Sequence, residues 1–272
     1  MIIKATEAQK NIILDFLDKD VDNNFFFIGD IENFGLHSKI HSTYVKLSPD
    51  NEIVAVLLIF NNTLLFYDPF SQLHWNEIIE IVNKNKLINI NISENMYKRF
   101  SNNFNSKRFN VHKQYLARLN SFVNLDTSRA IEATKEDIKL IVESRLKIPE
   151  FTEFTSDFVN EYNSYLESYE SGVSHPFIIK SSSGKVVSCA TIAINASNKS
   201  VIGGVYTLPE FRQSGLASIV VAALSNWILS RGNQPILFYH NPEAGKIYHS
   251  LGYKDVGILY TIVINDIKEK NV

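Results

Sequence analysis

The residues with the clearest chemical potential form one polar turn between an apolar strand pattern and an apolar helix pattern. The turn contains Arg212, Gln213, Ser214 and Gly215, and helix-spaced apolar residues begin at Leu216. The first amides of a helix lack intrahelical partners and lie at the positive end of the helix dipole, so they attract anions. Gly215 allows close approach and a positive φ, and Arg212 adds a full positive charge. The turn therefore predicts a binding site for an anion such as a phosphate.

Two common phosphate loops are excluded by the residues around the glycine. No Lys-Ser or Lys-Thr pair follows Gly215, so the turn is not the P-loop of nucleoside triphosphatases. The Gly-x-Gly-x-x-Gly pattern of dinucleotide-binding folds is also absent here. The alternative to an anion site is an ordinary connection from strand to helix.

A second motif follows the long helix. A strand pattern ends at Asn241, and Pro242 suits the first position of a helix, where a missing N–H costs nothing. Ala244 and Tyr248 are four residues apart, so they share one face of that helix. Gly252 is expected to cap its C-terminus.

Together the two motifs resemble the signatures of the GNAT superfamily of CoA-dependent N-acyltransferases. Arg212-Gln-Ser-Gly215-Leu-Ala217 resembles the family's pyrophosphate loop, Arg/Gln-x-x-Gly-x-Gly/Ala. Asn241–Tyr253 fills every position of its second signature, Asn-x-x-Ala-x-x-x-Tyr-x-x-x-Gly-Phe/Tyr. Two motifs in the family's order are more specific than either alone. The resemblance extends over residues 128–264 and is only architectural in the N-terminal half.

The resemblance implies that acyl-CoA lies in a cleft between the central strand, residues 200–207, and the strand at residues 236–239. The pantetheine arm would pair with the edge of the central strand, the pyrophosphate would lie on the amides of the loop, and Asn241 would reach the pantetheine. The residues assigned to the cofactor in this way are Val205, Tyr206, Thr207, Arg212, Gln213, Ser214, Gly215, Leu216, Ala217, Ser218, Asn241 and Ala244.

Acyl transfer to an amine needs a neutral amine, a donor to the developing oxyanion and a proton for the leaving thiolate. The resemblance implies a backbone N–H of the central strand for the oxyanion and Tyr248 for the proton. The alternative for Tyr248 is a packing role. The general base stays open among His240, Glu150, Glu153 and Tyr206, or a water chain without a dedicated base.

The elements that must position these residues occur in the same order in both halves of the chain: strand, helix, hairpin, central strand, helix, strand, helix, strand. After Tyr67 the first half continues through Asp68–Gln72 without an Arg-x-x-Gly-x-Ala pattern. We therefore predict an α+β fold of two tandem GNAT-like domains, each a mixed, mostly antiparallel splayed sheet flanked by helices. Residues 1–125 would be a degenerate copy and residues 126–272 the acyl-CoA-binding catalytic domain. The alternative is two unrelated α+β domains.

Three segments are predicted in less detail. Residues 23–30 form an aromatic segment that interrupts the first helix. Residues 150–169 form one helix, whose acidic residues either attract a cationic amine or are simply solvated. The chain ends in a strand pair around Tyr253 and residues 258–264.

The composition excludes several classes of function. The 272 residues have a net charge of −2, so no overall basic field favours nucleic acid or anionic lipid. The single cysteine, Cys189, fits a reducing compartment and lies in an apolar run typical of a buried thiol. No apolar run approaches the roughly 20 residues of a membrane span, and Met1–Asn11 is unlike a signal peptide. The histidines lack metal-ligand spacing, so we expect no metal. The cysteine count and the lack of a signal-like or membrane-spanning segment predict a cytoplasmic protein.

The sequence thus predicts an N-acetyltransferase that moves an acetyl group from acetyl-CoA to the amine of a small-molecule or amino-acid-like acceptor, as a monomer or homodimer. One alternative is a catalytically silent acyl-CoA-binding sensor or structural protein. Another is an aminoacyl-tRNA-dependent transferase of tandem GNAT fold, which the lack of a basic patch disfavours. No motif in the sequence identifies the acceptor.

Overall fold

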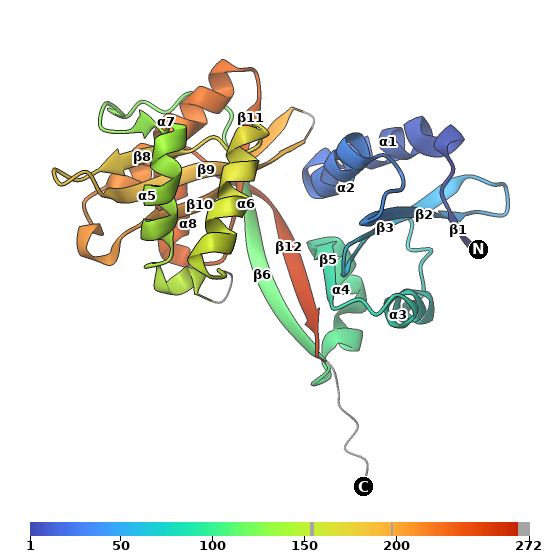
Figure 1. Cartoon of the computed structure of the whole chain (residues 1–272). Coiled ribbons are helices and arrows are strands. Elements are labelled where there is room, and N and C mark those ends of the chain that lie inside the picture. Colours follow the sequence, from blue (N-terminus) through green and yellow to red (C-terminus); the bar gives the residue numbers. More distant parts are fainter. Residues whose placement is uncertain (153–154, 197, 266–272) are drawn as a thin grey trace, which may run out of the picture. The chain divides into compact units, whose positions relative to one another are not determined.

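The computed structural model describes residues 1–152, 155–196 and 198–265. It divides the chain into two compact units, coloured along the sequence in Figure 1. Unit 1 contains Met1–Leu116 together with the chain from Val256, and unit 2 is Ala117–Asp255.

Unit 1 is built on a sheet whose hydrogen-bonded order is β1-β2-β3-β4-β5-β12-β6. Strands β4 and β5 are parallel, whereas the β1/β2, β2/β3, β3/β4 and β5/β12 pairs are antiparallel. Its elements are β1 (Ile2–Lys4), α1 (Lys10–Asp18), α2 (Val21–Phe34), β2 (His41–Leu47), β3 (Ile53–Phe60), β4 (Thr63–Tyr67), α3 (Trp75–Lys84), β5 (Asn89–Ser93), α4 (Glu94–Phe100), β6 (Phe109–Arg118) and β12 (Lys254–Ile264).

The central strand β3 is apolar throughout because helices cover both faces of the unit 1 sheet. Ala55, Leu57 and Ile59 pack into a core with residues of α3 and α4. Val56 and Leu58 point the other way and pack with residues of α1 and α2. Figure 1 shows the two helix pairs on opposite faces of this sheet.

Unit 2 repeats this arrangement in the order β11-β10-β9-β8-β7. Strands β10 and β11 are parallel and the other pairs are antiparallel. Helix α7 packs against β8, β9 and β10, while α5 packs against β9 and α6. The elements are β7 (Ile131–Glu132), α5 (Ile138–Arg145), α6 (Phe158–Glu170), β8 (Phe177–Lys180), β9 (Val186–Ala196), β10 (Lys199–Thr207), α7 (Leu216–Ser230), β11 (Gln234–Tyr239) and α8 (Pro242–Ser250).

The predicted internal repeat is confirmed, because each unit has one parallel pair at the same place in its sheet, β4/β5 and β10/β11. One strand does not pair with the other strands of its own repeat. β12 ends the second repeat, yet it pairs with β5 of unit 1, with Tyr260 opposite Ile92. The expected division at residue 125 places this strand in the second half instead. Its apolar pattern predicts a strand but not a partner, because that partner is far away in the sequence.

Three elements differ from the sequence-based expectation. Residues 23–30 lie inside α2, where Phe25, Phe27 and Ile28 are buried against the unit 1 core. Only one helical turn forms at Pro149–Phe151, and α6 begins at Phe158 after Asp157 caps it. Glu153 lies outside the described residues. The expected final strand pair is the single strand β12.

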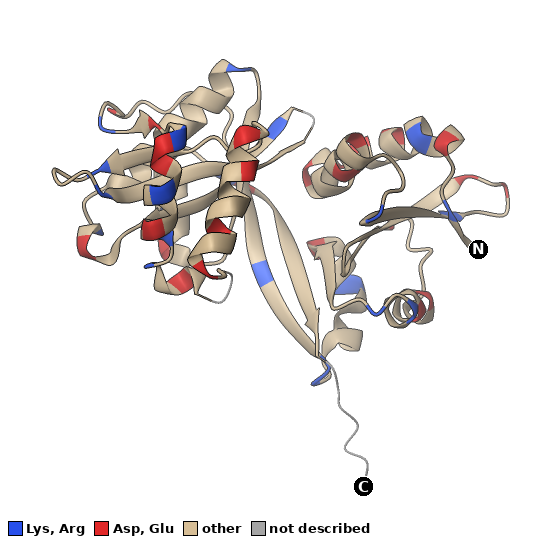
Figure 2. Ribbon diagram, viewed as in Figure 1, with Lys and Arg blue, Asp and Glu red and all other residues tan. Residues whose placement is uncertain are grey.

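The distribution of charged side chains and the burial of Cys189 agree with what the composition predicts. Figure 2 shows acidic and basic residues interspersed over both units. Cys189 is fully buried, and burial raises the pKa of its thiol to about 12, so it is a neutral core residue. Within the described ranges, no helix combines the length and the apolar character that crossing a bilayer requires.

Asp30 on α2 leads to a prediction about the stability of unit 1. Burial raises the pKa of this carboxyl from 3.8 to about 7. Because the pKa is higher in the folded than in the unfolded state, its contribution to stability is full below about pH 4 and is lost as the pH rises through 7. We expect Asp30→Asn to raise the thermal midpoint at pH 8 by about 4 °C or more, and much less at pH 5.

The control for Asp30→Asn is Asp15→Asn, which changes an exposed carboxylate on the neighbouring helix α1. Thermal unfolding of both variants at the two pH values measures the difference. An equal gain at pH 5 and pH 8, or an equal gain in the control, would contradict the assignment.

Candidate functional site

The candidate site lies in unit 2, where the parallel strands β10 and β11 separate. The two strands pair from Lys199 opposite Gln234 to Ile202 opposite Leu237, and the register ends there. From Gly203 to Thr207, the edge of β10 that faces β11 therefore has no strand partner. The splayed sheet expected from the sequence is confirmed.

A β-bulge lies in the unpaired half of β10. Gly203 is opposite Thr191 and Tyr206 is opposite Cys189, so three steps on β10 match two on β9. Gly204 lies in this bulge and has a φ of +56°, a conformation that glycine adopts readily. Val205 consequently has no opposite residue in the pairing of β10 with either neighbouring strand.

The predicted anion loop follows directly. Gln213 and Gly215 have φ values of +60° and +77°, and Gly215 is the N-cap of the 15-residue helix α7. In the described part of the chain, the amides from Gln213 to Ser218 donate to no backbone or side-chain acceptor. A run of unpaired amides before a long helix is an anion site by geometry and by dipole. The backbone strain at Gln213 fits a functional turn, since a non-glycine residue at positive φ costs about 1 kcal/mol or more.

Arg212 lies beside this loop but is already engaged. Its Nε donates to Thr207 O at 3.1 Å, and its two terminal nitrogens donate to the two carboxylate oxygens of Glu150 at 2.9 Å each. The guanidinium lowers the pKa of Glu150, which makes this carboxylate a poor general base. No local pattern in the sequence indicates this pair, because the two residues are far apart in the chain.

The second motif forms the start and inner face of α8. The side chain of Asn241 caps the helix, with Oδ1 accepting from Glu243 N at 2.9 Å. Ala244 is half-buried. Gly245 was not predicted to be part of the site, although a glycine inside a helix often marks close packing. A Cβ at Gly245 would lie 2.5 Å from the ring of Tyr239, so the glycine lets α8 lie close against β11.

Tyr248 is buried on α8 with an uncommitted hydroxyl. Its ring centroid lies 5.7 Å from that of Tyr239 and 6.1 Å from that of Tyr253. Tyr253 bonds Ser225 at 2.7 Å, whereas the Tyr248 hydroxyl has no hydrogen bond to any residue that the structure describes. Burial raises the pKa of Tyr248 to about 12, so at neutral pH it is a proton donor.

The other base candidates are not well placed. His240 is exposed after β11. The Tyr206 hydroxyl donates to Ile141 O at 3.1 Å and bonds Ser144 Oγ, and burial raises its pKa well above 10.0. Tyr206 is thus anchored to α5 by its side chain, and only its backbone is left for a ligand. Of the base candidates that the structure describes, Glu150 and Tyr206 are therefore held by other groups.

A parted parallel pair, a strand bulge and an amide-rich loop match one known family. The model of the GNAT acetyltransferase family matches residues 20–262. The chain belongs to this family. No curated protein matches it in sequence.

Solved structures show the same GNAT fold at low sequence identity. An acetyltransferase of the GNAT family from Colwellia psychrerythraea has a TM-score of 0.63 and 15% identity, with 97% of this chain and 100% of that chain covered. A GCN5-related N-acetyltransferase from Sphaerobacter thermophilus has a TM-score of 0.67 and 12% identity, covering 96% and 94%. A tandem GNAT protein from the clavulanic acid biosynthesis pathway has a TM-score of 0.62 and 11% identity, covering 96% and 97%. The tandem architecture spans nearly the whole chain.

At the corresponding place in unit 1, the amides of the loop are bound by a side chain of the same unit. Strands β4 and β5 also separate, after Leu65 opposite Asn91, and a cavity of about 390 Å³ lies there. The fully buried carboxylate of Asp68 accepts from Gln72 N at 2.9 Å and Leu73 N at 2.7 Å, and pairs with Arg99. A side-chain anion thus takes amides that the GNAT loop of unit 2 leaves open.

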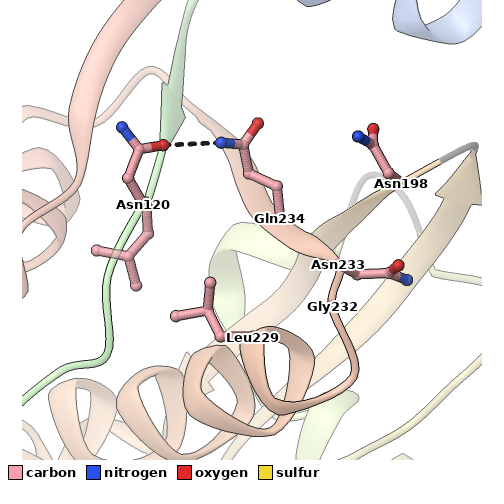
Figure 3. Close-up of a pocket in the computed structure, with 7 residues that line it drawn as sticks. Asn120, Asn198, Leu229, Gly232, Asn233 and Gln234 are labelled. Carbon is pink, nitrogen blue, oxygen red and sulfur yellow. Dashed lines mark hydrogen bonds between the residues drawn. The ribbon is translucent and has the colours of Figure 1, made fainter.

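Unit 2 has another hollow, at the opposite ends of β10 and β11. It measures about 250 Å³ and is lined by Leu119, Asn120, Asn198, Leu229, Gly232, Asn233 and Gln234. Figure 3 shows Asn120 accepting a hydrogen bond of 2.7 Å from Gln234. The strands are paired here and the polar lining is neutral amide, so we place the site at the parted ends instead.

Proposed function

We propose that unit 2 transfers an acetyl group from acetyl-CoA to the amine of a small-molecule or amino-acid-like acceptor. The observation that carries this proposal is the unpaired amide run of Gln213–Ser218 next to the unpaired edge of β10. The first suits a pyrophosphate, and the second suits the amides of a pantetheine arm, which can add to a strand edge as an extended peptide does. Unit 1, with Asp68 in its loop, is proposed to be the degenerate copy.

Three residues take specific parts in binding. Arg212 reaches a phosphate by exchanging Glu150 for it, since both are anions that suit the guanidinium fork. Asn241 uses Oδ1 for the helix cap and keeps its Nδ2 for the pantetheine. Ala244, on the same helix, is small enough to leave the arm room.

The chemistry uses the bulge and Tyr248. Acetyl-CoA supplies an activated acyl group. The N–H of Val205, in the bulge, is proposed to donate to the oxygen that becomes negative as the amine attacks. As the amine nitrogen bonds to the acyl carbon and the C–S bond breaks, Tyr248 gives its proton to the leaving sulfur. The amine loses its own proton to water, and water returns a proton to Tyr248.

Thiol release tests the proposed activity directly. The full chain is incubated with acetyl-CoA and a panel of small amines, and free CoA is measured together with the mass of the acetylated product. We expect release that depends on both substrates. Tight acetyl-CoA binding without turnover of any amine would favour the silent acyl-CoA-binding protein instead.

The loop assignment is tested by Gly215→Glu. A carboxylate at this position would repel the pyrophosphate and cover the amides, so we expect acetyl-CoA binding measured by calorimetry to be abolished. The matched control is Gly184→Glu, because Gly184 also has a positive φ, of +82°, and a Cβ there would likewise meet nothing within 4 Å. Both substitutions should lower the free energy of unfolding by a similar amount, because both glycines have a positive φ. Unchanged affinity in Gly215→Glu would rule out the loop.

Tyr248→Phe tests the proton donor. The variant keeps the ring contacts and removes the hydroxyl, so we expect kcat to fall by about 10- to 100-fold while the KM for acetyl-CoA stays within about twofold. Steady-state kinetics separate the two parameters. A raised KM with an unchanged kcat would make Tyr248 a binding residue.

A further inference from the structure

We propose that Arg145 binds a carboxylate of the acceptor, so that the acceptor is an amine that also carries a carboxylate group. This inference rests on the proposed function of unit 2 and names the class of its second substrate. It depends on four observations about the guanidinium: its place over the bulge, its anchoring, its unused donors and the neutral groups around it.

The guanidinium lies against the unpaired part of β10. A Cβ placed on Gly204 would be 3.5 Å from Nη1 of Arg145 and 3.2 Å from the side chain of Thr191. Gly204 immediately precedes Val205, whose N–H is proposed to meet the thioester oxygen. An acceptor held at Arg145 is therefore next to the reacting carbonyl.

Arg145 is fixed from two other directions. Its guanidinium carbon is 4.7 Å from the centre of the Phe151 ring, and its Nε is 3.4 Å from Oε2 of Glu161. Glu161 is itself anchored, since its Oε1 accepts from the backbone N–H of Ser156 at 3.0 Å. Figure 1 shows α5 and α6, which carry Arg145 and Glu161, side by side on one face of unit 2. A cation that is held in place without a bound ligand is prepared to bind one.

The donors of Arg145 are largely unused. A guanidinium has five N–H groups that match a carboxylate in pairs. In the described ranges, Glu161 is the one carboxylate within 4.0 Å of Arg145, and the buried Nε makes no hydrogen bond. Arg212 differs sharply, because both of its terminal nitrogens are bonded to Glu150. The Arg145 side chain is 21% exposed, so the unused donors remain accessible.

Among the described residues, Glu161 is the one carboxylate paired with this cation. Burial raises the pKa of Tyr165, Tyr206 and Cys189, all of which lie close enough to feel the charge of Arg145, so these three side chains are neutral at pH 7. The N–H groups of this half-buried guanidinium that Glu161 does not engage are consequently left for a further carboxylate. A planar carboxylate can accept from two N–H groups of the guanidinium at once, which an anion with a single acceptor atom cannot do.

Several acidic residues lie between 150 and 170, and one of them, Glu161, offsets part of the charge of Arg145. Those with a described ion pair or cap have structural partners: Glu150 with Arg212, Asp157 with the start of α6, Glu161 with Ser156 and Arg145, and Glu170 with Lys135.

The experiment compares matched acceptors: amino acids, their carboxamides and the corresponding decarboxylated amines. For the wild-type chain, we expect kcat/KM for the free acid to exceed that for the carboxamide by about 10- to 100-fold, the range for a charge-assisted pair. Arg145→Gln should bring this ratio close to one, and Arg145→Lys should restore part of it. Lys139→Gln, an exposed change on the same helix, is the control and should leave the ratio intact.

A binding measurement keeps the test independent of turnover. In the presence of CoA, free acids should raise the thermal midpoint of the wild-type chain and not that of Arg145→Gln, while the variant keeps its acetyl-CoA affinity. If acetylation occurs without preference for the carboxylate, or Arg145→Gln lowers activity equally for every acceptor, the inference is wrong while the proposed function stands. If free acids neither bind nor react, the inference is also overturned. Carboxylate-dependent binding without any acetyl transfer would instead remove the proposed function.

Discussion

The separation of β10 from β11 after Ile202 and Leu237 is the constraint on which the rest of unit 2 depends. A strand edge that loses its neighbour leaves backbone donors and acceptors that need another partner. The bulge at Gly204 adds to this by taking Val205 out of register with β9 as well. The amides before α7 and the close packing of α8 at Gly245 border the same opening. Backbone geometry rather than a cluster of reactive side chains thus defines the site.

The two units differ in whether a side chain of the same unit binds the amides at this opening. Both have a parallel pair that separates, yet in unit 1 the carboxylate of Asp68 satisfies the following amides and an arginine together. In unit 2 the equivalent amides stay open and the carboxylate of Glu150 holds only Arg212. The aspartate in the turn after β4 thus occupies, in a structural hydrogen-bond network, amides that could otherwise bind an anion.

The sequence predicted those features that depend on local order along the chain. The loop at Gly215, the cap at Asn241 and the buried Tyr248 follow from glycine, proline and helical spacing within a few residues. It failed where the deciding contact is remote: the pairing of β12 with β5, the Arg212–Glu150 pair and the position of Arg145 over Gly204. The aromatic run of α2 was not predicted to be helical, because its helical pattern is weak. Burial against the sheet stabilises the helix in spite of that pattern.

The place of β12 beside β5 makes unit 1 discontinuous in the chain, with all of unit 2 inserted before its last strand. During synthesis the N-terminal sheet must wait, with β5 unpaired on one side, until more than half of the protein has followed. Unit 2 is contiguous in the chain, so all of its residues are made before the part of β12 that belongs to unit 1. A stop codon before β12 would then damage the first-made part of the protein and leave most of the later part whole.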